Sequence, residues 1–368
     1  MNTKMYLMAT KDWKAKDINT ESISHLIIAF ARIGGDFKIS DWEMRLNAGD
    51  KNDIPLPDIV SSPLISVDKW AEIEKIRAKN PKLKIIGAVG GWGAEGFSDM
   101  AETPVTIDIF TDSVAEYVQK HNLDGFDLDW EYPTAPRGII KTRPSDRENF
   151  TALLKSVREK IGPEKEISYC TAAGKWFLDA IELYETIRYA NSIHIMTYDM
   201  AGTWDTETRH HTNLYPSPAD PESYKESSVS LSADYYLSAG IPPEAITIGY
   251  AAYGREFRGV ASNANNGLYQ KFTSKNPHIW QGGTIDFDTL EKYYVNKNGY
   301  TRFWDEHCLA PYLYSQTERN FITYDDCESV REKAKFAKEK KLGGIMCWEY
   351  TNDMQAKLMK TVYDEINK

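Results

Sequence analysis

Short runs of apolar and β-branched residues recur along the chain, with segments of helical spacing between them. Several of these runs are apolar almost throughout, which is typical of parallel strands that are buried on both faces. They predict eight strands, at residues 5–10, 25–33, 83–91, 125–130, 167–173, 193–200, 246–254 and 343–350. Eight strands that alternate with helices favour an α/β fold, the (β/α)8 or TIM barrel, with a doubly wound open sheet as the alternative.

The interval between Gly254 and Gly343 is much longer than one connecting helix requires. It carries strand and turn signals of its own, so we expect a small α+β insertion domain at residues 256–322, between strand seven and strand eight. Residues 1–255 and 323–368 would then form the catalytic barrel. An insertion at this place lies at the C-terminal face of a barrel, where active sites form.

The composition narrows the range of partners. The 368 residues carry a formal net charge of -10, so charge alone does not favour binding to nucleic acid or to an anionic membrane. No apolar run is long enough to cross a bilayer, so we expect neither a nucleic-acid nor a membrane partner. The 10 Trp and 22 Tyr are more informative, because planar amphipathic rings can cover the apolar faces of a ligand.

The cysteines and the N-terminal segment bear on the compartment. None of the four cysteines forms a CxxC pair, which argues against a zinc or redox motif. Cys170 and Cys347 lie in strand-like runs and are expected to be buried thiols, whereas pairing of Cys308 with Cys327 stays open. The first residues lack the continuous apolar region and the small-residue cleavage site of a signal peptide. A cytoplasmic protein, a leader already removed and another export route all remain open.

The stretch "DGFDLDWEYP" at 124–133 places acidic side chains in and after a predicted strand. Side chains alternate between the two faces of a strand, so Asp127, Asp129 and Glu131 share one face, which in a barrel is the interior. Asp124 is out of this phase and is expected to be structural. Three carboxylates this close cannot all ionise cheaply, so at least one pKa should be raised. A carboxyl group that keeps its proton at neutral pH can act as a general acid.

A D-x-D-x-E pattern by itself has two other interpretations. Carboxylates are hard oxygen ligands, so the strand could hold a divalent metal, or it could be a structural acidic edge at the mouth of the barrel. The other predicted strand ends carry Tyr and Trp rather than further acids, which favours a sugar site.

The acidic stretch resembles the D-x-x-D-x-D-x-E signature of glycoside hydrolase family 18, the chitinases. Further segments resemble motifs of the same family in the same order: "GAVGGW", "MTYDMAGTW", "GYAAYGR" and the closing segment that ends in "GGIMCWEY". The long interval before that segment resembles the chitinase insertion domain. The resemblance covers nearly the whole chain, and it implies a TIM barrel with that insertion.

The resemblance also implies a retaining mechanism in which the substrate assists. Glu131 would protonate the glycosidic oxygen and later activate water. Asp129 would accept the N–H of the 2-acetamido group and share a proton with Asp127. Tyr198 would donate to the acetamido carbonyl oxygen, which attacks C1 and forms an oxazolinium ion. Neither a metal nor a cofactor is implied.

Substrate-binding positions follow from the same resemblance. Trp348 would form the floor of the −1 subsite, and Trp92 and Trp204 would be aromatic platforms on the leaving-group side. The full set of expected binding residues is Trp348, Met196, Asp199, Trp92, Tyr132, Trp204, Tyr253, Arg255 and Tyr6, the last of these on the first strand.

Two positions depart from the family pattern. Ala88 stands where the S-x-G-G motif has Ser, so Asp127 should be one hydrogen bond short unless Tyr6 or water compensates, and the pH profile should shift. Ala251 replaces the usual Pro of the seventh-strand motif, which should loosen that strand end without removing chemistry. His210 and His211 fall in a loop after the sixth strand, where we expect solvated side chains.

The expected activity is that of a chitinase, which cuts the β-1,4 links between N-acetylglucosamine units by endo or exo action. One alternative is an endo-β-N-acetylglucosaminidase that acts on N-glycans or peptidoglycan, and another is a chitinase-like lectin that binds without cutting. The expected partners are chitin or N-acetylglucosamine oligosaccharides, a monomer is favoured, and such a substrate implies an extracellular location.

Overall fold

The structure is a computed structural model, and it describes residues 1–45, 64–66, 68–135, 140–220, 227–273 and 283–368. Eight parallel strands pair in the cyclic order β1-β2-β6-β7-β8-β9-β10-β16, and β16 pairs back with β1 to close a barrel. Their bounds are β1 Asn2–Met8, β2 His25–Ile33, β6 Lys84–Gly90, β7 Gly125–Asp129, β8 Glu166–Ala172, β9 Ser192–Met196, β10 Ile246–Ala251 and β16 Gly344–Trp348. The predicted (β/α)8 barrel is confirmed, and the open sheet is excluded.

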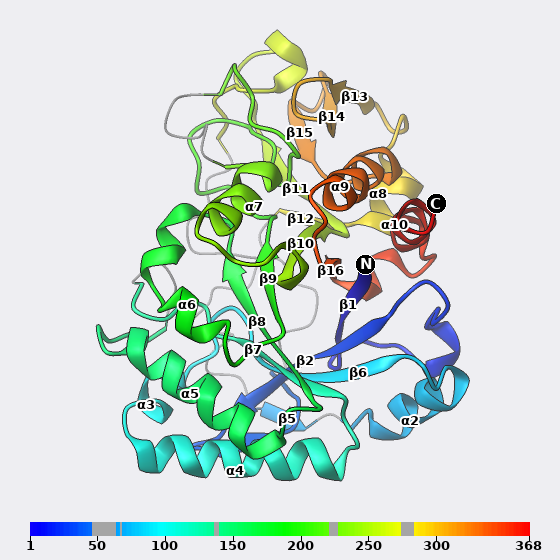
Figure 1. The fold of residues 1–368 in the computed structure, drawn as a ribbon. Coiled ribbons are helices and arrows are strands. Elements are labelled where there is room, and N and C mark those ends of the chain that lie inside the picture. Colours follow the sequence, from blue (N-terminus) through cyan, green and yellow to red (C-terminus); the bar gives the residue numbers. More distant parts are fainter. Residues whose placement is uncertain (46–63, 67, 136–139, 221–226, 274–282) are drawn as a thin grey trace.

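Helices surround this barrel (Figure 1). They are α2 Trp70–Lys79, α3 Phe97–Met100, α4 Pro104–Lys120, α5 Asp146–Ile161, α6 Leu183–Thr186, α7 Val229–Ser238, α9 Cys327–Glu339 and α10 Lys357–Ile366. Short 3-10 segments lie at Ala15–Asp17, Lys175–Asp179, Pro243–Ala245, Ala264–Gly267 and Tyr350–Asp353.

Local sequence signals account for the longer helices. The Thr103 hydroxyl caps α4 by accepting from the backbone N–H of Thr106, and Pro104 occupies the first turn, where its missing N–H costs nothing. Gly162 follows α5 with a φ of 83°, a left-handed conformation that suits glycine at a helix end. Asp326 caps α9 by accepting from the N–H groups of Glu328 and Ser329.

Strand alternation separates two hydrophobic layers. In β2, Leu26 and Ile28 face the helices and join the large outer core. Ile27 and Ala29 face the barrel interior, where they pack with Tyr6 and other buried residues. The interior is therefore a filled core, and aromatic side chains gather in it near the carboxyl ends of the strands.

A second sheet, of five antiparallel strands, has the order β12-β11-β15-β14-β13. The bounds are β11 Tyr253–Arg258, β12 Thr284–Asp286, β13 Thr301–Asp305, β14 Ala310–Ser315 and β15 Asn320–Thr323. A further helix, α8 Phe287–Tyr293, packs beside β11 and β12. In Figure 1, β13 to β15 lie at the opposite end of the molecule from α4. This sheet and α8 give the interval the expected α+β character, and its division from the barrel as a domain at 256–322 stays a prediction.

Several strand boundaries differ from the sequence-based prediction. The run 246–254 is two strands, because β10 ends at Ala251 and the chain then enters the antiparallel sheet as β11. The run 193–200 ends as a strand at Met196, which leaves Tyr198 and Asp199 in the following loop. Three short strands also form, β3 Ile39–Ser40 beside β2, and β4 Glu43–Arg45 paired with β5 Leu64–Ser66.

The four cysteines are free thiols. Cys170 and Cys347 are buried, as predicted, and Cys308 and Cys327 do not pair. Among the described residues, no helix combines the length and the apolar character needed to cross a lipid bilayer.

Candidate functional site

Three acidic side chains rise along β7 toward its carboxyl end. Asp127 and Asp129 belong to the strand, and Glu131 lies just beyond it. The exposed fractions are 0% for Asp127, 3% for Asp129 and 8% for Glu131, so all three carboxyl groups are buried. Non-proline cis peptide bonds occur within β2 at Ala29–Phe30, after β7 at Glu131–Tyr132 and at the end of β16 at Trp348–Glu349. The predicted acidic cluster therefore exists, with Glu131 at its outer end.

Asp127 accepts two hydroxyl hydrogen bonds. Tyr6 donates to its Oδ2 at 3.0 Å and Ser168 donates to its Oδ1 at 2.5 Å. Ala88 and Ser168 occupy the paired positions on either side of Asp127, on β6 and β8. Compensation for Ala88 by Tyr6 was one expectation from the sequence, and Tyr6 does donate to Asp127. Ser168 supplies a second hydroxyl from the other neighbouring strand, which was not expected from the sequence. Burial raises the pKa of Asp127 to about 6, while both hydroxyl groups and the charge of Lys4 act in the opposite direction.

Asp129 lies between two other carboxyl groups. Burial, and then the charges of Glu131 and Asp127, raise the pKa of Asp129 well above its ordinary value. Its Oδ1 atom is buried and has no hydrogen-bond partner among the described residues. A buried acceptor without a donor is costly, so this oxygen is poised to accept from a ligand.

Glu131 is held in its protonated form. Burial raises its pKa to about 8, the contact with Tyr132 lowers it, and the charge of Asp199 raises it again. The result is a carboxyl group that keeps its proton at neutral pH, which is the requirement for a general acid.

The loop after β9 brings Tyr198 over the barrel interior. Tyr198 is 8% exposed, and its hydroxyl points to the Met346 sulfur at 3.8 Å. A thioether is a weak acceptor, so the hydroxyl keeps the capacity to donate to a better one. Its ring meets Tyr253 edge-on with centroids 6.3 Å apart, and Met196 packs against the same interior cluster.

Asp199 and Arg255 form a buried ion pair in which the Arg255 Nε donates to Asp199 Oδ1 at 2.5 Å. Burial would raise the pKa of Asp199, but the Arg255 charge and contact with His211 hold it well below its ordinary value. Asp199 is therefore an anion near Glu131. The Arg255 guanidinium also lies 4.7 Å from the ring centroid of Trp204, a side chain that is 41% exposed.

Aromatic side chains form two groups. Trp348 stacks on Phe30 at 5.4 Å and lies 5.7 Å from Tyr6, above the interior cluster. Trp92 meets Tyr132 at 6.4 Å, and Tyr132 in turn meets Trp176 at 5.2 Å. Of the binding residues expected from sequence, two end barrel strands, Met196 and Trp348, and four lie in loops that follow barrel strands, Trp92, Tyr132, Asp199 and Trp204. Tyr253 and Arg255 lie in β11, and Tyr6 lies inside β1 in the barrel interior.

Sequence reasoning missed Ser168, Phe30 and Trp176. Ser168 could have been found, because it is two residues from Cys170, which was expected to be buried, and so shares its face of the strand. Phe30 could not, because the register of β2 with β6 shifts between Ile28 and Ala31 and breaks the alternation. The expectation of solvated histidines was also wrong, since His210 and His211 are 3% and 0% exposed and His211 Nδ1 lies 3.7 Å from Asp199 Oδ1.

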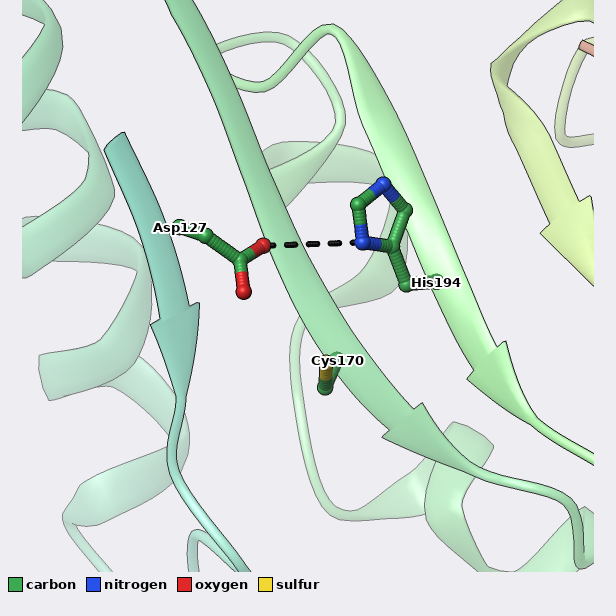
Figure 2. A group of neighbouring side chains, drawn as sticks. All are labelled: Asp127, Cys170 and His194. Atoms are coloured by element: carbon green, nitrogen blue, oxygen red, sulfur yellow. Dashed lines mark ion pairs between the residues drawn. The ribbon is translucent and has the colours of Figure 1, made fainter. Parts of the chain in front are cut away.

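Figure 2 shows Asp127, Cys170 and His194, which meet inside the barrel from three neighbouring strands. Their potential ligand atoms lie within 4.8 Å of one another, a spacing that a metal ion would need. The surrounding chemistry opposes a cation there: both Asp127 oxygens already accept hydroxyl groups, and the Lys4 Nζ lies 2.9 Å from His194 Nε2. Burial also raises the pKa of the Cys170 thiol well above its usual range, which disfavours the thiolate.

Two surface pockets lie elsewhere. One, of about 480 Å³, is lined by Met1, Asn2 and residues at the amino end of the barrel, and the other, of about 510 Å³, lies between the β2–β3 turn and the start of α4. The acidic set lines neither of them, so the candidate site rests on its carboxylates and rings.

A closed parallel barrel with buried carboxyl groups and aromatic rings at the carboxyl ends of its strands is an arrangement of barrel glycosidases. The profile of "Glycosyl hydrolases family 18" matches residues 2–353, and the chain belongs to this family.

Curated relatives include Chitinase A1 of Niallia circulans, which is 36% identical over 387 residues, an alignment covering 93% of this chain and 54% of that protein. Probable chitinase 2 of Drosophila melanogaster is 31% identical over 84% of this chain and 68% of its own length. The chain thus spans about half of the first relative and about two thirds of the second.

Solved structures show the same fold. Chitinase ChiW from Paenibacillus sp. str. FPU-7, a cell-surface-expressed multi-modular enzyme, superposes with a TM-score of 0.87 at 35% identity, covering 100% of this chain and 43% of ChiW. A family 18 N-acetylglucosaminidase from Paenibacillus barengoltzii superposes with a TM-score of 0.83 at 32% identity and covers 99% of both chains.

Proposed function

We propose that this protein is a chitinase that hydrolyses β-1,4 links between N-acetylglucosamine units with retention of configuration. One observation carries the proposal: Glu131 is buried and protonated at neutral pH directly beside Asp129, whose Oδ1 lacks a hydrogen-bond donor. An acid next to a vacant acceptor suits a sugar with a glycosidic oxygen and an acetamido N–H on adjacent carbons. Family membership and the chitinases among its relatives support the same substrate.

In the first step, Glu131 gives its proton to the glycosidic oxygen as the bond from C1 to that oxygen breaks. The acetamido carbonyl oxygen forms the new bond to C1, so the substrate provides the nucleophile. Asp129 Oδ1 accepts the acetamido N–H and stabilises the positive charge of the oxazolinium ion, and the Tyr198 hydroxyl donates to the acetamido oxygen. In the second step, water attacks C1 and gives a proton to the Glu131 carboxylate, while the bond from C1 to the acetamido oxygen breaks and the acetamido group is restored. Two inversions at C1 give net retention.

Asp127 has a supporting role in this scheme. It shares a proton with Asp129 before the substrate arrives, and it becomes the anion when Asp129 turns its proton toward Glu131. The hydroxyl groups of Tyr6 and Ser168 stabilise that anion, because both can donate to it. Tyr6 thereby acts on Asp127 as well as on the sugar.

The aromatic groups would bind the remaining sugars. Trp348, fixed by stacking on Phe30, forms the floor of the −1 subsite, with Met196, Tyr253, Asp199 and Arg255 around it. Trp92, Tyr132 and Trp204 present rings to the leaving-group side, where apolar sugar faces can stack. The segment 256–322 acts as an insertion domain on the barrel of 1–255 and 323–368 and walls this side. Because chitin is an insoluble polymer, we also propose that the protein acts outside the cell, as a monomer.

A second activity is favoured by one specific similarity. The N-acetylglucosaminidase from Paenibacillus barengoltzii matches this chain over 99% of both lengths, so the same residues could release single N-acetylglucosamine units. The two activities share their chemistry and differ in product length. A lectin is disfavoured, because Glu131 is present and protonated at neutral pH.

The test is a time course on a chitin hexamer, with the products separated by length and the anomer of fresh product followed by NMR. The proposal predicts the β-anomer first, together with undiminished activity in EDTA. Dimers and trimers as first products identify a chitinase, and monomers alone identify the second activity. An α-anomer first, or complete loss of activity in EDTA, would contradict the mechanism.

A further inference from the structure

A line of buried polar side chains runs through the barrel interior beneath the acidic set. It begins at Lys4 and passes through His194 and Tyr6 to Asp127. The exposed fractions are 4% for Lys4, 1% for His194 and 1% for Tyr6, so water does not solvate these groups. A lysine buried this deeply under an active site needs a compensating interaction.

The distances along the line are those of consecutive hydrogen bonds. Lys4 Nζ lies 2.9 Å from His194 Nε2, and it donates to Ser192 Oγ at 2.8 Å. His194 Nδ1 lies 2.7 Å from the Tyr6 hydroxyl, which donates to Asp127 Oδ2 at 3.0 Å.

The chemistry of Lys4 sets the direction of every bond above it. An ammonium group has three donors and no acceptor, so His194 Nε2 must accept and the ring proton must sit on Nδ1. Nδ1–H then donates to the Tyr6 oxygen, and the Tyr6 O–H donates to Asp127 Oδ2 at 3.0 Å. The Cys170 Sγ also lies 3.1 Å from the Tyr6 hydroxyl, but a thiol sulfur is a weaker acceptor than a carboxylate oxygen. Three donors in series thus point from a buried cation to one carboxylate oxygen.

We propose that Lys4 is a positioning residue of the hydrolytic site, which acts through His194 and Tyr6 to hold Asp127 as an anionic acceptor. The inference rests on the proposed function, because it assigns Lys4 a part in keeping the charge of the inner aspartate available during turnover. Lys4 touches neither the sugar nor the reacting atoms in this scheme.

The charges around Lys4 are consistent with this role. The titratable groups that face it are His25 on β2, Lys84 on β6, Asp127 on β7, Glu166 and Cys170 on β8, and His194 on β9. The residue in register with Lys4 on β16 is Met346, and the residue in register with His194 on β10 is Thr247, and neither of these two titrates.

The protonation states fit the same direction of bonding. Burial lowers the pKa of Lys4 to about 8 against the opposing charges of Glu166 and Asp127, so the ammonium persists at neutral and acidic pH. Burial and the Lys4 charge hold the pKa of His194 well below its ordinary value, so the ring stays neutral.

The first test uses the wild-type protein and no substrate. Two-dimensional NMR of isotope-labelled histidine, assigned with a His194→Gln sample, reports which ring nitrogen carries the proton. The proposal predicts a neutral His194 with the proton on Nδ1 from about pH 5 to about pH 7. A proton on Nε2, or a charged ring in this range, would overturn it. Because no hydrolysis is involved, this outcome is independent of whether chitin is the substrate.

The second test is the pH profile of Lys4→Met, whose side chain keeps the length and loses the charge. Loss of the cation should raise the pKa of Asp127 by about one unit. The acidic limb of the kcat/KM profile should shift to higher pH by the same amount. This means that kcat/KM falls about tenfold at about pH 5 and only about twofold at about pH 7. An unchanged acidic limb in the folded variant would overturn the proposal.

Two further variants separate this path from a general loss of charge. Lys84→Met removes a lysine that is 48% exposed and pairs with Glu166 without contacting His194, and it should leave the acidic limb in place. In a Tyr6→Phe background the hydrogen-bonded path is already cut, so adding Lys4→Met should produce a smaller shift than it does in the wild-type protein, because only the direct attraction between the Lys4 and Asp127 charges remains. A full additional shift there, or an equal shift in Lys84→Met, would show that Lys4 does not act through Tyr6.

Discussion

Ser168 Oγ donates a 2.5 Å hydrogen bond to Asp127 Oδ1 from the directly paired position on β8. On the other side of Asp127, Ala88 occupies the paired position on β6 and has no hydroxyl to offer. Of the two strands next to β7, only β8 therefore supplies a hydroxyl donor at the position paired with Asp127.

Ser168→Ala should therefore slow hydrolysis. Loss of one hydroxyl donor to a buried carboxylate costs about 1–3 kcal/mol, which corresponds to a fall in kcat of about 5-fold to 150-fold. The acidic limb of the pH profile should also move to higher pH, because the Asp127 anion is less well stabilised and the pKa of Asp127 rises. Steady-state kinetics on a chromogenic chitobioside measures both effects.

Ala88→Ser provides the matched control for this prediction. In the Ser168→Ala background it places a hydroxyl on the opposite side of Asp127 and should recover part of the lost rate. By itself it should change little, since Asp127 already has two donors. No recovery in the double variant would show that Ser168 matters for reasons other than donation to Asp127.

The eight barrel strands could be predicted from the sequence because their apolar runs are strong and separated by helices. The break after Ala251 could not be predicted, because "ITIGYAAYG" is apolar and aromatic throughout while the chain changes sheets within it. A change of pairing partner leaves no mark on hydrophobicity.

The alkaline limb of kcat/KM should fall as pH rises through about 8, because Glu131 then loses the proton it must donate. Asp199→Asn should move this limb to lower pH, because the charge of Asp199 helps to raise the pKa of Glu131. Asn tolerates the left-handed φ of 56° at this position, so the backbone can keep its course. An alkaline limb that does not move in Asp199→Asn would contradict the assignment of Glu131 as the acid.

A buried ion pair outside the site, Lys333 with Asp325, should contribute strongly to the free energy of unfolding. Lys333 and Asp325 are each 1% exposed and lie 2.5 Å apart, and Asp325 Oδ2 also accepts from the Ala251 N–H at 3.1 Å. Lys333→Met would leave Asp325 charged and unpaired, so it should lower the free energy of unfolding by about 3–5 kcal/mol. Urea unfolding followed by circular dichroism measures this change.

Lys335→Met is the matched control, since Lys335 is 45% exposed and pairs with Glu332 on the same helix. An exposed pair of this kind contributes about 0–1 kcal/mol. Equal destabilisation by the two variants would contradict the role given to the Lys333–Asp325 pair.

The candidate site could be predicted where it depends on sequence phase and family motifs. Asp127, Asp129 and Glu131 fall in that class. The line from Lys4 to Asp127 could not be predicted, because Lys4 and His194 belong to strands that meet only when the barrel closes. Alternation puts Lys4 on the same face of its strand as Tyr6, but it does not show that Lys4 reaches His194 across the closed barrel. The buried positions of His210 and His211 depend in the same way on tertiary contacts.

The central claim is that Glu131 is the proton donor, and Glu131→Gln tests it most directly. Gln keeps the size and hydrogen bonding of Glu but cannot donate a proton to a leaving group, so kcat should fall by about a thousandfold. Calorimetric affinity for a chitin tetramer should stay within about threefold of wild type, because the binding residues are untouched. Asp124→Asn is the control: Asp124 lies off the inner face, its side chain is 39% exposed and it accepts from the Ile85 N–H, so turnover should be retained. A Glu131→Gln variant that turns over at a rate near wild type would contradict the account.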